Sequence, residues 1–90
     1  MAELWSLDHF ARGMQFDHQG KHYHTLRASD LKRDGMGLEL LCGSNTVAEV
    51  FYSDLTGGVT ISVFEPSLPL EVVERLIAEA RVDLPPVTKS

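Results

Sequence analysis

The sequence predicts an α+β domain, in which a five-stranded antiparallel sheet carries a C-terminal helix packed on one face. Three observations lead to this class: a strand-like alternation of apolar residues over 36–64, a shorter alternating stretch before it, and a helical apolar period after it. The strands are expected as one hairpin followed by a three-stranded meander. The chain of 90 residues is expected to be a single small domain spanning residues 1–90, with residues 87–90 as a loose tail.

The first element expected is a short N-terminal helix, or an irregular segment, over residues 3–12. Apolar residues recur there at helical spacing, and Gly13 is a helix stop. Two large aromatic residues, Trp5 and Phe10, are expected to cover one face of the sheet. The alternative is that they stack on a ligand.

A hairpin is predicted over residues 14–26, with residues 18–21 as its loop. This register sets Phe16 opposite Tyr23 on the core side. Residues 28–35 are then expected to form a connection with a single helical turn, capped by Ser29 or Asp30. Because side chains alternate along a strand, four polar residues share the outward face of the hairpin. They are Gln15, Asp17, His22 and His24.

The three-stranded meander is predicted over residues 36–64, around turns at residues 43–45 and 53–58. The first turn sets Leu40 opposite Ala48. The second turn sets Tyr52 opposite Val59 and Val50 opposite Ile61, so the third strand continues the same register. A slip of one residue would send every side chain to the wrong face, so the agreement across three strands supports the pairing.

The C-terminal helix is predicted to begin at Pro69 and to end before Pro85. One side of this helix is charged. The other side is an apolar stripe that is expected to pack on the sheet. Its members are Leu70, Val73, Leu76, Ile77, Ala80 and Leu84.

The face of the meander that points away from this core carries too many apolar side chains for open water, which is typical of an interaction surface. The residues expected to form that surface are Glu39, Leu41, Val47, Glu49, Phe51 and Phe64. The first functional prediction is therefore a non-enzymatic protein-interaction module. Its partner is another protein or a second copy of the chain, in a homodimer formed through this back face.

The alternative prediction is a domain that binds a metal or a small ligand at the hairpin. Asp17, His22 and His24 offer one carboxylate and two imidazoles, which suit zinc or another transition ion, and His18 could add a fourth group. Surface histidines with no ligand have the same pattern, since exposed strand positions are polar.

A third hypothesis is a small hydrolase in which Glu39 and Glu49, opposite each other in the predicted register, act as acid and base. A flat sheet face offers no obvious cleft for such a pair. The single cysteine, Cys42, is expected to be a small core residue and not a nucleophile. The sequence contains no standard catalytic, phosphate-binding or dinucleotide-binding motif.

Composition excludes some partners. The formal net charge is −5, from 13 acidic and 8 basic residues, and without clustered Lys and Arg a nucleic-acid partner is not expected. No apolar run is long enough to cross a bilayer, and the first residues lack the pattern of a signal peptide, so no membrane association and a cytoplasmic location are expected. The layout resembles that of many small bacterial domains, which concerns architecture and not function.

Overall fold

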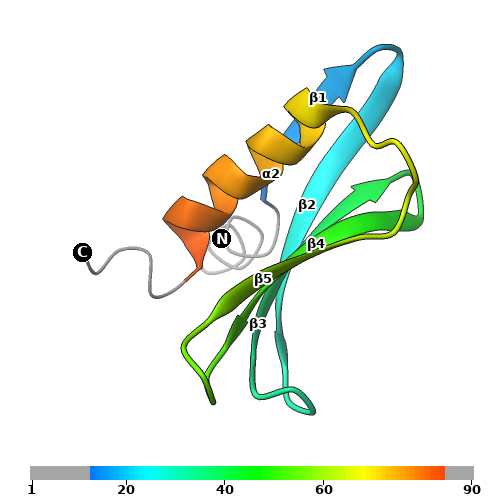
Figure 1. Cartoon of the computed structure of the whole chain (residues 1–90). Helices are drawn as coiled ribbons and strands as arrows, with labels where there is room; N and C mark the ends of the chain where they lie inside the picture. The colour runs from blue at the N-terminus through cyan, green and yellow to red at the C-terminus, as the bar shows by residue number, and fades with distance from the viewer. Residues whose placement is uncertain (1–12, 85–90) are drawn as a thin grey trace, which may run out of the picture.

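The computed structural model describes residues 13–84 (Figure 1). The expectations for residues 3–12 and 87–90 lie outside the described residues. Within residues 13–84, six elements follow one another: β1 (Gln15–His18), β2 (Lys21–Asp30), β3 (Gly35–Cys42), β4 (Asn45–Ser53), β5 (Val59–Val63) and α2 (Leu70–Asp83). The strands form one antiparallel sheet in chain order, so the predicted α+β class and five-stranded sheet are confirmed.

The β1–β2 hairpin has the predicted register but a tighter turn. Phe16 pairs with Tyr23, as expected, and their rings stack with centroids 5.4 Å apart. The predicted four-residue loop is wrong, because His18 also pairs with Lys21 and leaves a two-residue turn. Both turn residues have positive φ, 50° at Gln19 and 83° at Gly20, as in the type I′ turn that is common in two-residue hairpins.

Strand β2 runs four residues further than predicted and joins the hairpin to the meander. It reaches Asp30, and its residues 23–30 pair with β3 along the whole of that strand. The predicted connection is therefore a turn of residues 31–34 alone. Asp30 caps this turn as expected, because its Oδ1 accepts hydrogen bonds from the backbone N–H groups of Lys32 and Arg33 at 3.1 and 3.2 Å.

A β-bulge distinguishes the β3–β4 hairpin from the prediction. Leu40 pairs with Ala48, as the sequence predicted, but the next pair joins Leu41 to Thr46. Val47 is the additional residue of the bulged strand, and the turn shortens to residues 43–44 in compensation. Val47 therefore does not join Leu41 on the predicted back face. Val47 lies instead within the buried core cluster.

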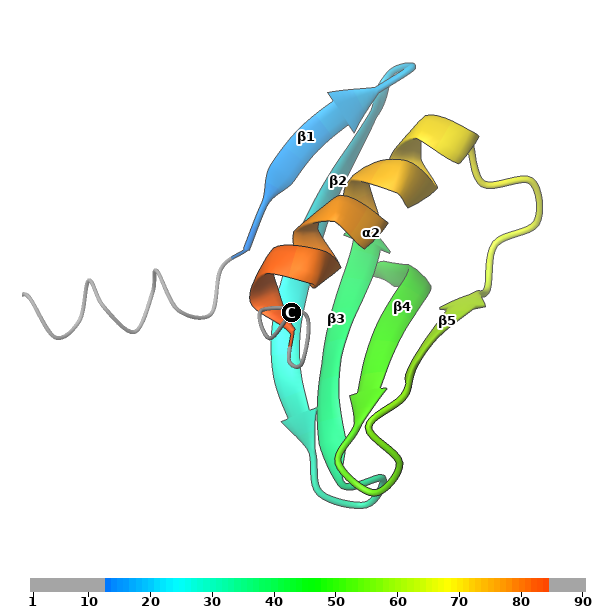
Figure 2. The ribbon, with the colours of Figure 1, turned by 60° about the vertical axis from the view of Figure 1, so that its left-hand side comes forward.

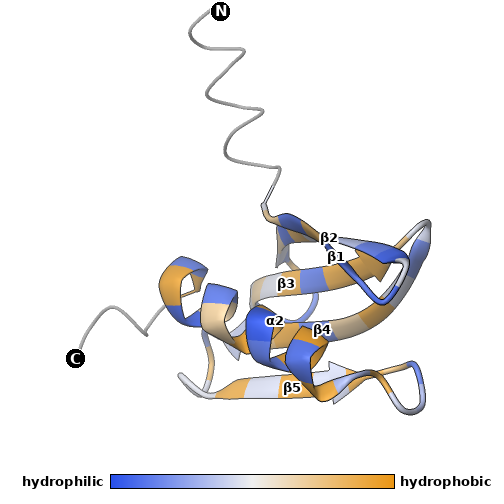
Figure 3. Cartoon of the chain, turned by 90° about the horizontal axis from the view of Figure 1, so that it is seen from above, coloured by the Kyte–Doolittle hydropathy of each residue, from blue (hydrophilic) through white to orange (hydrophobic). Residues whose placement is uncertain are grey.

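Helix α2 lies on one face of the sheet, so the fold has two layers (Figures 2 and 3). The core between them is apolar. Its members are Phe16, Tyr23, Leu38, Leu40, Val47, Ala48, Val50, Val72, Leu76, Ala80 and Leu84. Burying each large side chain contributes about 1.5–3 kcal/mol. The described residues contain no helix that is long and apolar enough to span a membrane.

The buried side of α2 is rotated relative to the predicted stripe. Val72 was not in the predicted stripe, yet it is buried together with Leu76 and Ala80. Leu70 is exposed, and Ile77 is only half-buried. Part of the predicted apolar stripe therefore lies at the side of the helix and not between the helix and the sheet.

Candidate functional site

Strand β5 forms one edge of the sheet, and within residues 13–84 it pairs only with β4. Two hydrogen bonds flank this pairing: Ser53 N–H donates to the Gly58 carbonyl, and Phe64 N–H donates to the Val47 carbonyl. They determine which residues of β5 direct their backbone groups toward β4. Bonded and non-bonded pairs alternate along an antiparallel ladder. It follows that Thr60 and Ser62 direct their backbone groups toward β4.

The backbone N–H and C=O groups of Val59, Ile61 and Val63 consequently point away from β4, to the open edge of the sheet. The side chains of the same three residues point to the helix side of the sheet, where 46%, 43% and 49% of each remains exposed. Edge strands in native proteins commonly carry charged residues or proline, which prevent pairing with other chains. The sequence of β5, VTISV, has neither.

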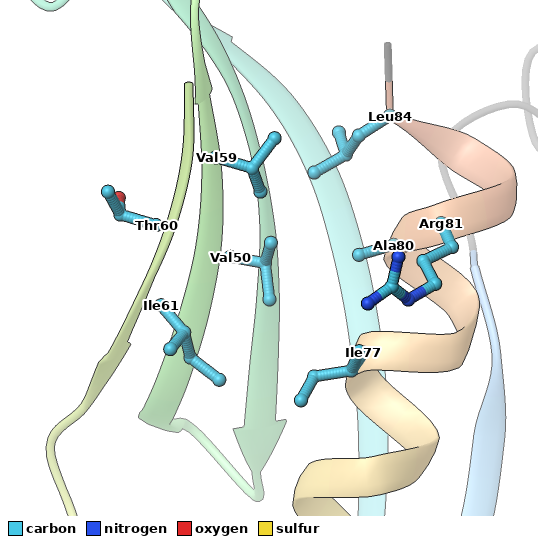
Figure 4. A pocket seen from close by; sticks show the side chains of 8 residues that line it. All are labelled: Val50, Val59, Thr60, Ile61, Ile77, Ala80, Arg81 and Leu84. Atoms are coloured by element: carbon cyan, nitrogen blue, oxygen red, sulfur yellow. The ribbon is translucent and has the colours of Figure 1, made fainter. Parts of the chain in front are cut away.

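A groove of about 280 Å³ separates β5 from α2 (Figure 4). Val59 and Ile61 project into it from the sheet, while Ile77 projects from the helix. Thr60 borders the groove but points away from it. The complete lining is Val50, Val59, Thr60, Ile61, Ile77, Ala80, Arg81 and Leu84. On this side of α2, part of the predicted apolar stripe, including Ile77, stays uncovered.

The opposite side of α2, toward β1 and β2, is held by polar contacts. The Thr25 hydroxyl lies 3.0 and 3.1 Å from the two carboxylate oxygens of Glu79, to which it donates. The guanidinium of Arg75 lies 4.4 Å from the centroid of the Phe16 ring. Arg27 donates to the backbone carbonyl of Asp83 at 3.3 Å. The helix is therefore anchored on one side and leaves an apolar gap on the other.

Glu79 has an unusual acidity because of this anchoring. Partial burial raises the pKa of its carboxyl to about 7; the hydrogen bond from Thr25 opposes the rise, and the neighbouring Asp83 adds to it. Thr25 is fully buried and also accepts a 2.8 Å hydrogen bond from the Met14 N–H. The Glu79 carboxyl therefore links the helix to the sheet through Thr25, and its charge changes near neutral pH.

Arg81 is the cation at the groove, and Figure 4 shows its guanidinium beside the apolar lining. Other basic residues have partners: Lys21 lies 3.9 Å from Glu65, and Arg33 pairs with Asp30. Arg81 makes no ion pair or hydrogen bond with any residue in the described part of the chain. The groove therefore combines an apolar lining with a positive charge that no group within residues 13–84 compensates.

Arg33 covers part of the predicted back-face surface, because it folds over Glu49 and Phe51 from the β2–β3 turn. Its guanidinium donates to both carboxylate oxygens of Glu49, at 3.2 and 2.9 Å, and lies 4.0 Å from the centroid of the Phe51 ring. Glu49 and Phe51 are consequently only 8% and 9% exposed. These two carboxylate contacts raise the pKa of Arg33 above its already high ordinary value, and Asp30 adds a third.

The other predicted back-face residues are scattered. Glu39 does lie opposite Glu49, as the sequence predicted, but Arg33 neutralises the latter. Leu41 is half-buried and Phe64 is exposed. Cys42 lies on the core side, as expected, and packs against the core cluster.

The hairpin brings together two of its three predicted metal ligands. His22 Nδ1 lies 2.5 Å from Asp17 Oδ1, and both side chains are exposed. His24 lies opposite Gln15 in the register and takes no part in this contact. In the described residues, no three His, Cys, Asp or Glu side chains lie close enough together to hold a metal ion. The zinc site stays a prediction from the sequence.

Sequence reasoning missed the β5 edge and the groove, although the signal for the edge was present. The predicted pairings of Tyr52 with Val59 and Val50 with Ile61 are confirmed, yet they place these residues in a core and do not reveal their exposure. The uncharged sequence of β5 was the available clue. No protein-family model matches the chain, and neither curated proteins nor solved structures gave a match.

Proposed function

We propose that this domain is a non-enzymatic protein-interaction module that forms a homodimer by pairing β5 with β5 of a second copy. The observation that carries the proposal is the open edge itself: an uncharged strand whose outward backbone groups have no partner within residues 13–84 and whose apolar side chains remain nearly half exposed. The expected homodimer is kept, but its interface moves from the back face, which Arg33 partly covers, to the sheet edge.

The sequence of β5 complements itself. An antiparallel two-fold pairing about Ile61 sets this residue opposite its own copy and Val59 opposite Val63. These three residues carry the outward backbone groups, so each facing pair would exchange two N–H···O bonds. On the other face Thr60 meets Ser62, a pairing of hydroxyls that favours adjacent strands.

Charge favours the same arrangement. A chain of net charge −5 repels its own copy over most of its surface, and like charges directly opposite each other destabilise a strand pair. Because β5 contains no ionisable residue, the strand pairing itself adds no like-charge contact. Antiparallel pairing would leave both copies of α2 on the same face of a continuous sheet.

The solution mass of the tag-free protein tests this proposal. Light scattering over a range of concentrations should give a dimer whose mass does not change when a chelator is added. A monomer at every concentration would contradict the proposal. A dimer that dissociates with chelator would instead support the metal site predicted at Asp17, His22 and His24.

A proline at the edge provides the matched variant. Val63→Pro removes an outward N–H without removing a hydrogen bond to β4, so the fold should tolerate it, as edges tolerate proline. We expect Val63→Pro to be monomeric. Val63→Thr keeps both the N–H and the β-branched shape, and it should remain dimeric. A dimeric Val63→Pro would show that the interface lies elsewhere.

A further inference from the structure

We propose that the groove between β5 and α2 binds a small amphipathic anion, an unbranched medium-chain carboxylate being the class that fits best. The inference goes beyond the proposed dimer and rests on the geometry of one protomer. It starts from a groove of about 280 Å³ that a helix and an edge strand form together. This volume is just below the range of about 300–1,000 Å³ that is usual for ligand pockets, so the ligand must be small.

The lining of the groove favours a ligand with a hydrocarbon chain. Six of the eight lining residues have aliphatic side chains, contributed by both the sheet and the helix: Val50, Val59, Ile61, Ile77, Ala80 and Leu84. The apolar surface left exposed at Val59 and Ile61 is nearly half of each residue. Covering it with a hydrocarbon chain is favourable by about 25 cal/mol for each Å² removed from water.

The positive charge of Arg81 favours a ligand with an anionic head group. Arg81 lines the groove through the last turn of α2, and no carboxylate of the described residues neutralises it. Arginine can lay its aliphatic stem along apolar surface while its guanidinium stays in water. In this position the guanidinium can donate two parallel hydrogen bonds to a carboxylate, a geometry that a neutral or cationic head group cannot reproduce.

Other basic residues do not offer the same combination. Arg75 lies over the Phe16 ring, and Arg33 is occupied by Asp30 and Glu49. Lys32 is exposed in the β2–β3 turn and lines no part of this groove. Arg81 is thus a cation placed where an apolar chain could end, and Lys32 is its natural control.

Titration calorimetry with decanoate, below its micelle-forming concentration, tests the inference on the full chain. We expect one site per protomer, with decanol binding at least fivefold more weakly and decyltrimethylammonium more weakly still. Equal affinities for decanoate and decanol would overturn the role of the charge. Heat seen only at micelle-forming concentrations would overturn the site.

Three variants locate the binding. Arg81→Gln should weaken decanoate at least fivefold and decanol less than twofold, whereas Lys32→Gln should change neither. Ile77→Gln keeps good helix propensity and should weaken both probes, because it places an amide in the apolar wall. Undiminished binding of decanoate by Arg81→Gln, or of both probes by Ile77→Gln, would contradict the assignment.

The Val63→Pro variant separates this inference from the proposed dimer, since Val63 is not part of the groove lining. A monomeric Val63→Pro that binds decanoate like the natural chain supports a site within one protomer. Binding lost together with the dimer would show that a second copy forms or occupies the site, and it would overturn the inference as stated. A dimer that binds no decanoate would overturn the ligand alone.

Discussion

Arg33 and Glu49 form a two-point ion pair across the face of the sheet that α2 leaves uncovered, with Nη1–Oε1 and Nη2–Oε2 distances of 3.2 and 2.9 Å. The pair joins the β2–β3 turn to the middle of β4. Because Arg33 also lies over Phe51, it shields from water two of the residues predicted to form an interaction surface on this face, Glu49 and Phe51.

Removing this cover should destabilise the fold. Arg33→Met keeps an aliphatic side chain over Phe51 but leaves the buried Glu49 carboxylate without its charged donor, a loss that costs about 1–3 kcal/mol. Urea unfolding should show a lower midpoint for Arg33→Met and no comparable change for Lys32→Met, one residue away. Adding Glu49→Leu to Arg33→Met should restore part of the stability. An additive double variant would mean that the two side chains do not interact.

Glycines in β3 allow the back-face side chains to lie close to the sheet. A Cβ on Gly35 would lie 2.0 Å from the Tyr52 carbonyl oxygen, and one on Gly37 would lie 2.5 Å from Glu49 Oε2. A backbone atom cannot move aside as a carboxylate can, so Gly35→Ala should cost more than Gly37→Ala. Overpacking of this kind typically costs about 1–3 kcal/mol. Gly58→Ala, which meets only the Thr56 hydroxyl at 3.3 Å, is the control, and equal losses for all three would contradict the explanation.

The pH dependence of stability should carry a contribution from Glu79. Its pKa in the folded chain is about 7, against an ordinary 4.5, so folding favours the protonated carboxyl. This contribution is fully present below pH 4.5 and is lost as the pH rises toward 7. Since the side chain is partly exposed, solvent screening limits the loss to about 1 kcal/mol.

Chemical denaturation at several pH values measures this dependence. The difference in unfolding free energy between the natural chain and Glu79→Gln should shift in favour of Glu79→Gln as the pH rises from 4.5 to 7. A difference that stays constant over this range would show that the carboxyl is not perturbed.

Strand pairing was predictable because alternation and turn residues act locally. The predicted pairings of Leu40 with Ala48 and Val50 with Ile61 are both present. The bulge at Val47 was not predicted, since a loop of three residues and a turn of two with a bulge give the same downstream register. Only the packing of Val47 into the core distinguishes them.

The candidate site was harder to predict because it depends on where the helix lies. Periodicity identifies an apolar side of α2 but not where the helix lies on the sheet. Two contacts, of Glu79 with Thr25 and of Arg75 with Phe16, hold the helix toward β1 and β2. That position buries Val72 and leaves Ile77 beside the groove. Such long-range polar contacts have no signature in the local sequence.

The central claim, that β5 pairs with its own copy about Ile61, is tested most directly by a charge exchange at that residue. Ile61→Lys and Ile61→Glu should each be monomeric by light scattering, because the two-fold axis places like charges opposite each other. Mixed in equal amounts, they should form a heterodimer that high salt weakens. The control Leu31→Lys, at a site that is 89% exposed, should remain a homodimer. Two single variants that stay dimeric, or a mixture that stays monomeric, would contradict the claim.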